Sequence, residues 1–544
     1  MKAYLLYPDR DSDWQWVSKA TALREGRRNG RKTPELEGFS PGKALPWNAE
    51  LLTHDLGLDH LFSAMAGDAD DVRVVVEREV LNGSDNDLAT IAYRQALLAD
   101  ALANPAAVKE LLAIAREAVD AQRRHYLSTL LGDHPDHVLR WAIEALEAAI
   151  PSIRRLRALT DTADAIFVAP GWQRFFAMIR TELDDTYLDR VTRQLGELKL
   201  RDGVRMSAAL GDGGHAVSYV LHQPPVQHYT WFERFLRRWF PSFYEPDDQF
   251  GFSISPRDES GARALREFSN RGIAIAAQAL GRAALHLRDF FAMLRAETAF
   301  YVGGITLHEQ LAGAGLATCF PELAERAPAL RFTGIYDPVL ALAATGAVVA
   351  NDANADGRSL IVITGANQGG KSTFLRAIGA AQLMAQAGLF VPAQAYAANP
   401  ASAVMTHFKR EEDASMASGK FDEELARMSA IVDHFKPCAL LLFNESFAAT
   451  AEREASEIAD ELIEGLRAKG GKVVFVTHLF EYAHGVAGRA DPAALFLRAD
   501  RAPDGSRPFR VIEGEPLATS YGQDLYRAVF DGDGNGGDVV AFTS

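Results

Sequence analysis

The sequence predicts two kinds of structure in one chain. An α/β domain built on a parallel sheet is expected to be joined to a mainly helical domain that carries a small β-hairpin insertion. Alanine- and leucine-rich stretches with apolar residues three and four apart dominate the chain up to about residue 330. Beyond that point, short apolar runs alternate with helical patterns, and a glycine-rich loop follows one of these runs.

Composition limits the classes of protein to which the chain can belong. The 544 residues predict about three or four domains at roughly 150 residues each. Hydrophobic residues make up 48% and charged residues 24%, and no run of about eighteen apolar residues could span a bilayer, so no membrane protein is expected. The net charge of −15 argues against a generally basic surface but leaves room for a local basic groove. With Cys319 and Cys438 as the only cysteines, a cytoplasmic location is expected.

The first part of the chain is expected to be helical. Short helices and loops are predicted up to about residue 85, followed by long amphipathic helix that breaks near Asn104-Pro105. Two β-prone runs, 204–210 and 216–221, flank a turn of glycine and aspartate and predict a hairpin. The helical pattern returns between about 257 and 312 and is expected to end near Gly303-Gly304. Two long helical blocks around a small insertion suggest a lever.

Strands and helices alternate from about residue 330 onwards, as in an α/β sheet. The expected strands are 359–364, 403–408, 439–443 and 472–478, and the expected helices begin after Lys371, at Phe421 and at Glu454. The predicted organisation is an N-terminal segment, a helical core and lever with a reduced insertion near 186–240, an α/β domain and a flexible tail, over residues 1–50, 51–330, 331–525 and 526–544.

A phosphate-binding loop is the most specific functional pattern. It follows a β-branched strand pattern, precedes a helical one, and matches G-x-x-x-x-G-K-[ST] with Gly365, Ala366, Asn367, Gln368, Gly369, Gly370, Lys371 and Ser372. Glycines let backbone N–H groups turn inward around phosphates, Lys371 would neutralise β/γ charge, and Ser372 would offer a hydroxyl to Mg²⁺. The alternative is a glycine-rich turn that binds no ligand.

Two further strand ends carry polar residues suited to hydrolysis. Asn444 and Glu445 end the apolar run 439–443, where an Asp-Glu pair would be typical. Glu445 is the candidate base for the attacking water, and Asn444 is a neutral oxygen ligand for the metal. His478 ends the next run and could orient the water or sense the γ-phosphate. The alternatives are that Glu445 only caps its strand and that His478 is structural.

These motifs together resemble the ATPase domain of the MutS family of DNA mismatch repair proteins. The resemblance rests on "TGANQGGKST" at the loop, which adds Thr364 and Thr373, on Val391-Pro392-Ala393, and on Thr477, His478 and Glu481, and it covers about residues 335–522. It implies an ABC-type P-loop ATPase on helical arms that binds ATP and Mg²⁺. The expected catalytic residues are Glu445, His478 and Lys371, the nucleotide ligands run from Gly365 to Thr373, and the metal ligands are Ser372 and Asn444.

The resemblance also implies partners. Two ATPase domains are expected to pair head to tail in a homodimer, with Ser418 reaching the nucleotide of the partner subunit; Ser415 and a simple serine N-cap are the alternatives. Val348 stands where mismatch-binding members carry a phenylalanine that stacks on adenine. Because the lever already begins near residue 50, the sequence predicts a divergent branch without the N-terminal mismatch-reading domain.

Two functional hypotheses follow. The first is an ATP-driven clamp that acts on DNA, either in mismatch repair or on branched structures, with structure favoured over a mismatch. The arginines and aromatic residues of 229–240 are candidate contacts, although their spacing equally fits an amphipathic packing helix. The second is an ATP-driven clamp or scaffold that holds a protein partner without touching DNA, which the acidic net charge favours.

Overall fold

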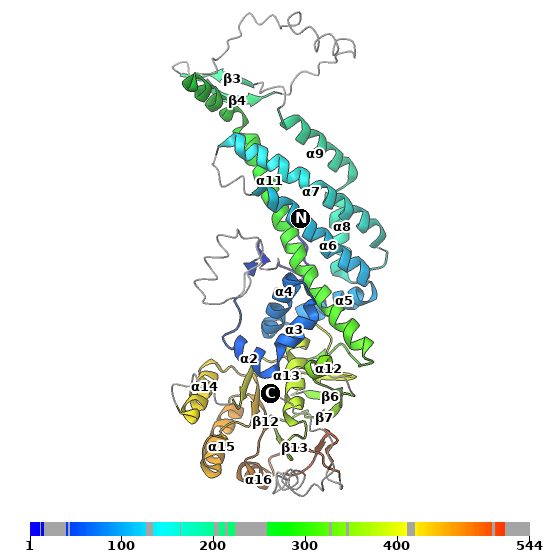
Figure 1. Ribbon diagram of the computed structural model, residues 1–544, viewed down its shortest axis with the longest axis vertical. Helices are drawn as coiled ribbons and strands as arrows, with labels where there is room; N and C mark the ends of the chain where they lie inside the picture. The colour runs from blue at the N-terminus through cyan, green and yellow to red at the C-terminus, as the bar shows by residue number, and fades with distance from the viewer. Residues whose placement is uncertain are drawn as a thin grey trace, which may run out of the picture.

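The molecule is elongated, with an α/β base at one end and a helical arm that rises from it (Figure 1). The computed structural model describes residues 1–10, 12, 14–15, 40–41, 44–126, 134–163, 165–200, 206–212, 216–222, 258–325, 329–343, 347–410, 419–502 and 506–516. Ser415, Ser418, the segment 229–240 and the tail 526–544 lie outside these residues. Within the described residues, no helix is both long and apolar enough to cross a bilayer.

A six-stranded sheet forms the centre of the base. Its strand order is β10-β11-β12-β8-β13-β14, and all neighbours are parallel except the last pair. The strands are β8 (Leu360–Thr364), β10 (Val404–Phe408), β11 (Leu440–Asn444), β12 (Lys472–Val476), β13 (Ala494–Ala499) and β14 (Val511–Glu513). The predicted alternation of strands and helices is confirmed, with β8 between β12 and β13.

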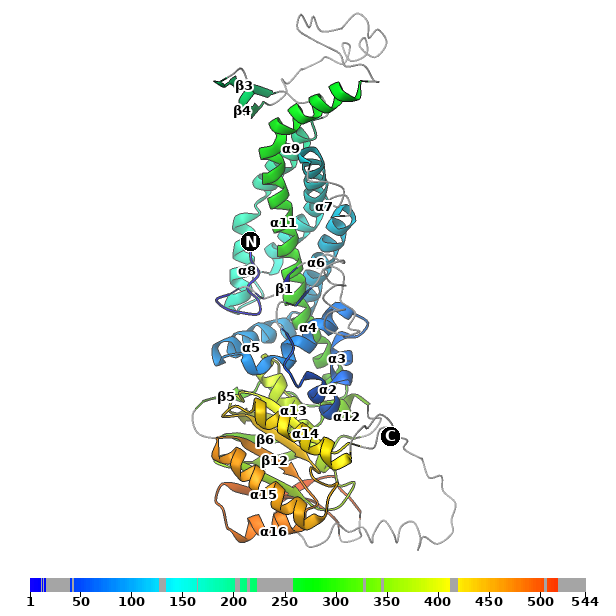
Figure 2. The ribbon, with the colours of Figure 1, turned by 90° about the vertical axis from the view of Figure 1, so that its left-hand side faces the viewer.

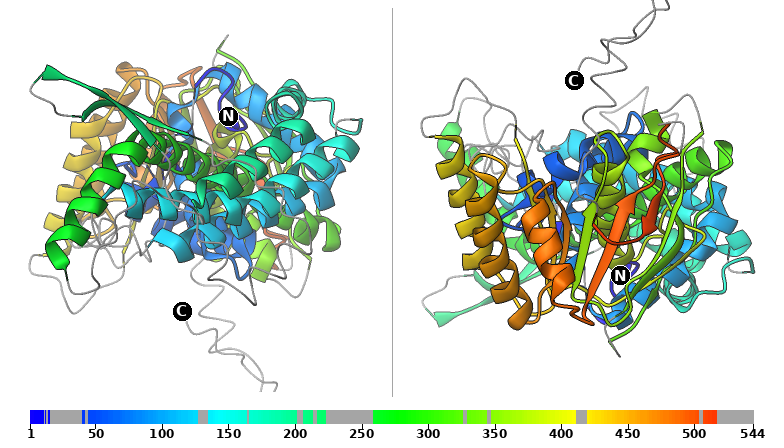
Figure 3. Two further views of the ribbon diagram at one scale, coloured as in Figure 1. Left: turned by 90° about the horizontal axis from the view of Figure 1, so that it is seen from above. Right: turned by 90° about the horizontal axis from the view of Figure 1, so that it is seen from below.

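Helices cover both faces of this sheet because successive strand residues point to opposite sides. Ile361 and Ile363 pack with α13 (Lys371–Ala387), whereas Leu360 and Val362 belong to the core on the opposite face. That second core includes residues of α14 (Lys420–His434), α15 (Glu452–Ala468) and α16 (Phe480–Gly488). Seen from below, α14 in yellow and α15 in orange lie side by side along one flank of the sheet (Figure 3, right).

A second, smaller sheet completes the base and was not predicted. Its order is β5-β9-β6-β7, with β6 antiparallel to both neighbours. The elements are β5 (Glu322–Leu323), β6 (Leu330–Ile335), β7 (Asn351–Asn354) and β9 (Ala395–Ala398), and α12 (Pro338–Ala343) lies between β6 and β7 in the chain. α12 contacts α13.

The arm is built of helices around one long helix, α11 (Glu259–Gly313) (Figure 2). The others are α2 (Ala49–Leu56), α3 (Leu58–Ala66), α4 (Asp70–Leu81), the 3₁₀ turn η1 (Gly83–Asp85), α5 (Leu88–Ala103), α6 (Pro105–Tyr126), α7 (Pro135–Ala163), α8 (Pro170–Glu182) and α9 (Asp185–Leu198). A short pair, β1 (Trp14–Gln15) and β2 (Ser40–Pro41), belongs to the N-terminal segment.

Two local predictions in the arm are confirmed. The chain breaks at Asn104, where α5 ends and Pro105 starts α6, because proline suits a first helical turn but not a helix interior. The hairpin is also present: β3 (Met206–Leu210) pairs with β4 (Ala216–Leu221) in antiparallel register. It lies at the end of the arm farthest from the base (Figure 1).

The predicted end of the last helix at Gly303-Gly304 is wrong. α11 continues through both glycines to Gly313. Their role is packing rather than termination: a Cβ at Gly303 would lie 2.5 Å from Val76 Cγ1, and one at Gly304 would lie 2.9 Å from Leu98 Cδ1. The two glycines therefore let α4 and α5 approach the backbone of α11.

The buried side chain of Arg94 joins the arm to the base. It is fully buried, and it donates to Glu79 Oε2 of α4 at 2.8 Å, to Leu6 O at 2.9 Å and to Ala387 O at 3.2 Å. Ala387 is the last residue of α13, which begins at the phosphate-binding loop. One guanidinium thus links the helix that follows the loop to the N-terminal segment and to α4.

Gly303→Ala should destabilise the protein by about 1–3 kcal/mol, because the added methyl group must displace Val76 in a close-packed core. Gly313→Ala in the same helix is the matched control, since a Cβ there meets no atom within 4 Å. Urea unfolding followed by circular dichroism measures the difference. A Gly303→Ala midpoint equal to that of Gly313→Ala would show that α4 and α11 do not pack this closely.

Candidate functional site

The glycine-rich loop turns tightly between β8 and α13. Gly365 and Gly370 have φ angles of 110° and 85°, in the region that favours glycine, and Gln368 at the apex has a φ of 56°. A Cβ at Gly369 would lie 2.9 Å from Ala366 O. Asn367 and Gln368 are exposed, so the apex of the loop faces solvent. The residues form a narrow backbone cradle that side chains would fill.

Lys371 lies inside this cradle. Its Nζ donates to Gly365 O at 3.0 Å and to Ala366 O at 2.9 Å, and the residue is only 5% exposed. Burial lowers the pKa of Lys371 to about 8, Glu445 acts in the opposite direction, and the charge of Arg507 lowers the pKa further. The ammonium therefore sits in a poorly solvated position, where an anion would stabilise its charge.

Ser372 and Asn444 bring two oxygens together at the start of α13 and the end of β11. Ser372 Oγ donates to Asn444 Oδ1 at 3.0 Å. Both are oxygen donors, the ligand type that Mg²⁺ prefers, but neither carries a charge, so the ion would take more of its ligands from phosphate and water. The pair therefore fits the metal role predicted for it. The partly exposed Thr373 follows on α13.

Glu445 and His478 meet at the ends of adjacent strands. His478 Nε2 donates to Glu445 Oε1 at 2.9 Å, and Lys409 Nζ lies 3.8 Å from the other carboxylate oxygen. The hydrogen bond from His478 lowers the pKa of Glu445, partial burial acts the other way, and Lys409 and Lys371 lower it further. At neutral pH the carboxylate is ionised, as a water-orienting base must be.

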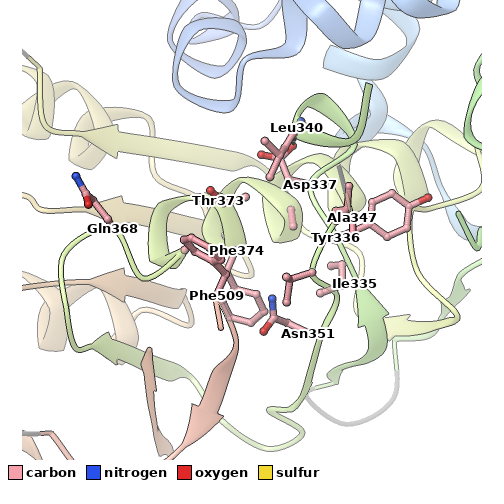
Figure 4. Close-up of a pocket in the computed structure, with 14 residues that line it drawn as sticks. Ile335, Tyr336, Asp337, Leu340, Ala347, Asn351, Gln368, Thr373, Phe374 and Phe509 are labelled. Carbon is pink, nitrogen blue, oxygen red and sulfur yellow. Dashed lines mark hydrogen bonds between the residues drawn. The ribbon is translucent and has the colours of Figure 1, made fainter. Parts of the chain in front are cut away.

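An apolar pocket of about 470 Å³ opens beside the loop (Figure 4). It is lined by Ile335, Tyr336, Asp337, Leu340, Ala347, Val348, Val349, Asn351, Gln368, Gly370, Thr373, Phe374, Ala377 and Phe509. Its walls come from the α12–β7 region, from α13 and from the segment before β14. A mainly apolar pocket that adjoins a phosphate cradle has the shape and chemistry for a nucleoside.

Sequence reasoning missed the segment before β14. Phe509 lines the pocket together with Val348, and its carbonyl oxygen lies 3.3 Å from the position of a Cβ at Gly370. Arg507 Nη1 donates to Gln368 Oε1 at 3.0 Å, across the apex of the loop. Nothing in the sequence marked these two residues, because they reach the loop only through the pairing of β13 with β14.

The described site residues are therefore brought together. Those from Gly365 to Thr373, with Asn444, Glu445 and His478, lie at the carboxyl ends of β8, β11 and β12, where parallel α/β sheets bind ligands. Ser418 precedes Gly419, the N-cap of α14, and lies outside the described residues. Within the described residues, no cluster of three or more His, Cys, Asp or Glu side chains could hold a metal by itself.

One edge of the sheet combines a phosphate cradle, a strand that ends in a carboxylate and a pocket suited to a nucleoside. Together with the helical arm, these features define an ABC-type nucleotide-binding ATPase domain joined to an arm. Two family models match the chain: the MutS2 N-terminal domain over residues 86–314 and MutS domain V over residues 361–527. The chain belongs to the MutS family, as its motifs predicted.

Two curated relatives are similar to part of the chain. The chain is 30% identical to the DNA mismatch repair protein MutS of Synechococcus sp. (strain CC9605) over 173 residues, 32% of this chain and 19% of that protein. It is 29% identical to the DNA mismatch repair protein MutS 2 of Halobacterium salinarum (strain ATCC 700922 / JCM 11081 / NRC-1) over 199 residues, 36% of this chain and 23% of that protein. The similarity thus spans about a fifth of each relative.

Arg507→Ala should weaken ATP binding by about 10- to 100-fold, because a charge-assisted hydrogen bond to phosphate contributes about 1.5–3 kcal/mol. Adenosine affinity should stay unchanged. Arg510→Ala, an exposed arginine three residues further on, is the control. Isothermal titration with ATP and with adenosine measures both effects. If Arg507→Ala and Arg510→Ala bind ATP equally well, Arg507 does not contact the phosphates.

Proposed function

We propose that this chain binds and hydrolyses ATP to drive a clamp-type conformational change, and that it acts on DNA. The observation that carries the proposal is the convergence of Lys371, the Ser372–Asn444 pair and the Glu445–His478 pair at one edge of the sheet. A loop without ligand would need neither a paired carboxylate nor an adjoining nucleoside pocket.

The residues divide the chemistry among them. The loop from Gly365 to Thr373 holds the phosphates through its backbone N–H groups, and Lys371 neutralises their charge. Glu445 orients the attacking water and accepts its proton, and His478 holds the carboxylate in place through the 2.9 Å hydrogen bond. Mg²⁺, held by Ser372 and Asn444, would neutralise phosphate charge when bound.

The arm supplies the mechanical output of the proposal. α13 runs from the loop to Ala387, where Arg94 ties it to the arm. We infer that two chains pair through their ATPase domains, with Ser418 of one chain reaching the nucleotide of the other, so that ATP closes the pair. The helical arms would then move together around the bound partner.

DNA is the proposed partner because both relatives are named as DNA mismatch repair proteins. The second candidate is a protein partner, and the net charge of −15 favours it, since an acidic surface repels phosphate backbones. If the partner is DNA, we propose that the protein binds branched DNA in preference to a mismatched duplex.

Glu445→Gln should leave ATP affinity unchanged and slow hydrolysis by about two to four orders of magnitude, the range that general-base catalysis supplies. Phosphate release measures the rate, and equilibrium titration measures the affinity. Lys371→Ala is the contrasting variant, in which ATP binding itself should be lost. Undiminished turnover in Glu445→Gln would place the base elsewhere.

In the presence of ATP, the Glu445→Gln variant should retain branched DNA on filters more tightly than plain or mismatched duplex, because slow hydrolysis holds the closed state. The titration is run with and without ATP at 50 and 200 mM salt, since phosphate contacts weaken steeply as salt rises. Failure to retain any of the three DNAs at low salt would favour the protein-partner alternative.

A further inference from the structure

The turn that carries Glu445 is strained. Glu445 and Phe447 have φ angles of 53° and 66°, a left-handed conformation that side chains with a Cβ rarely adopt. Such strain persists only where the surrounding structure fixes it. The question is which groups fix this turn.

One link comes from β10. Ser446 is 1% exposed, and its Oγ lies 2.7 Å from Nδ1 of His407, which is equally buried. The His407 ring also stacks on the Phe447 ring, with centroids 6.0 Å apart and planes at 24°. His407 therefore touches both residues that follow Glu445.

A second link comes from α14. Glu424 is 4% exposed, and its Oε1 accepts the backbone N–H of Phe447 at 2.7 Å. The backbone carbonyl of the same residue lies 3.1 Å from His407 Nε2. Glu424 thus holds the turn directly through its side chain and indirectly through His407.

The protonation state of His407 decides which of its ring nitrogens donates a hydrogen bond and which accepts one. Burial, followed by the charge of Arg427, lowers the pKa of His407 to about 4, so the ring is neutral at pH 7 and carries one N–H. A carbonyl oxygen can only accept, so Nε2 carries the proton and Nδ1 is an acceptor. The one proton of the Ser446 hydroxyl is within reach of two acceptors, Nδ1 at 2.7 Å and the backbone oxygen of His407 at 3.0 Å. Both acceptors belong to His407, so the Ser446 hydroxyl holds the turn to that residue in either case.

We propose that Glu424, His407 and Ser446 are positioning residues that set the direction of the Glu445 carboxylate and tie it to α14. The inference rests on the proposed role of Glu445 as base. α14 begins directly after Gly419, next to the loop expected to reach the partner's nucleotide. A displacement of α14 would therefore move the turn that holds the base.

The test compares two variants that remove one link each. Ser446→Ala deletes the donor to His407, and Glu424→Ala deletes the acceptor for Phe447. Each should lower kcat by about 10- to 100-fold, because a misplacement of about 1 Å at a catalytic group costs about that much. ATP affinity should change less than about threefold. Glu424→Gln keeps a carbonyl oxygen for Phe447 and should restore most of kcat. Asp433→Ala, an exposed acid on the same helix, is the control.

A double-mutant cycle separates positioning from a general effect on folding. If Glu424 acts through Glu445, then Glu424→Ala adds no further loss of kcat in a Glu445→Gln background. The proposal is overturned if the losses of kcat multiply in the double variant or if ATP affinity falls in parallel with kcat. It is also overturned if kcat is unchanged in both single variants. An unchanged kcat in Glu445→Gln alone would instead refute the proposed base, so the two failures are distinguishable.

Discussion

The arrangement of arm and base depends on one buried guanidinium. The Arg94 guanidinium donates hydrogen bonds to Leu6 O, to Glu79 of α4 and to Ala387 O of α13. It also lies over the aromatic ring of Phe300 of α11. A buried charge is tolerated only when its donors are satisfied, and loss of a partner typically costs about 3–5 kcal/mol. The backbone at Gly388 also packs closely against this residue, since a Cβ there would lie 2.4 Å from Arg94 Cβ. The helix after the phosphate loop and the arm are therefore held as one packed unit.

Sequence patterns predicted the main sheet, the long helices and the hairpin, because period and turn chemistry are local properties. They did not predict the second sheet, since β5 has two residues and β7 is "NDAN", with no β-branched or apolar run to mark it. The glycine-rich loop and the strand ends were visible as motifs. Arg507, Phe509 and His407 were not, because each reaches the site through strand pairing. Gly303 and Gly304 resembled a helix end because paired glycines are typical of one. The residues of α4 and α5 that pack against them are distant in sequence and could not be recognised from it.

The electrostatics of the site differ from those of the whole chain. The net charge is −15, yet in the described part of the site Lys371, Lys409 and Arg507 outnumber the acids Glu445 and Asp337. Asn444 in place of another acid strengthens this imbalance. A locally positive edge on an acidic molecule concentrates small polyanions there while repelling them elsewhere. The same imbalance leaves less negative charge for a divalent cation, which must then obtain more of its ligands from phosphate and water.

The length of α11 would amplify any change of angle at its base. Its 55 residues, at about 1.5 Å each, give a contour length of about 80 Å between the base and the hairpin. A tilt of about 5° at the base would displace the far end by about 7 Å, more than the pitch of one helical turn of about 5.4 Å. In the proposed clamp, rearrangements too small to break the packing around Arg94 would therefore suffice to move the far end of the arm past a strand of a bound partner.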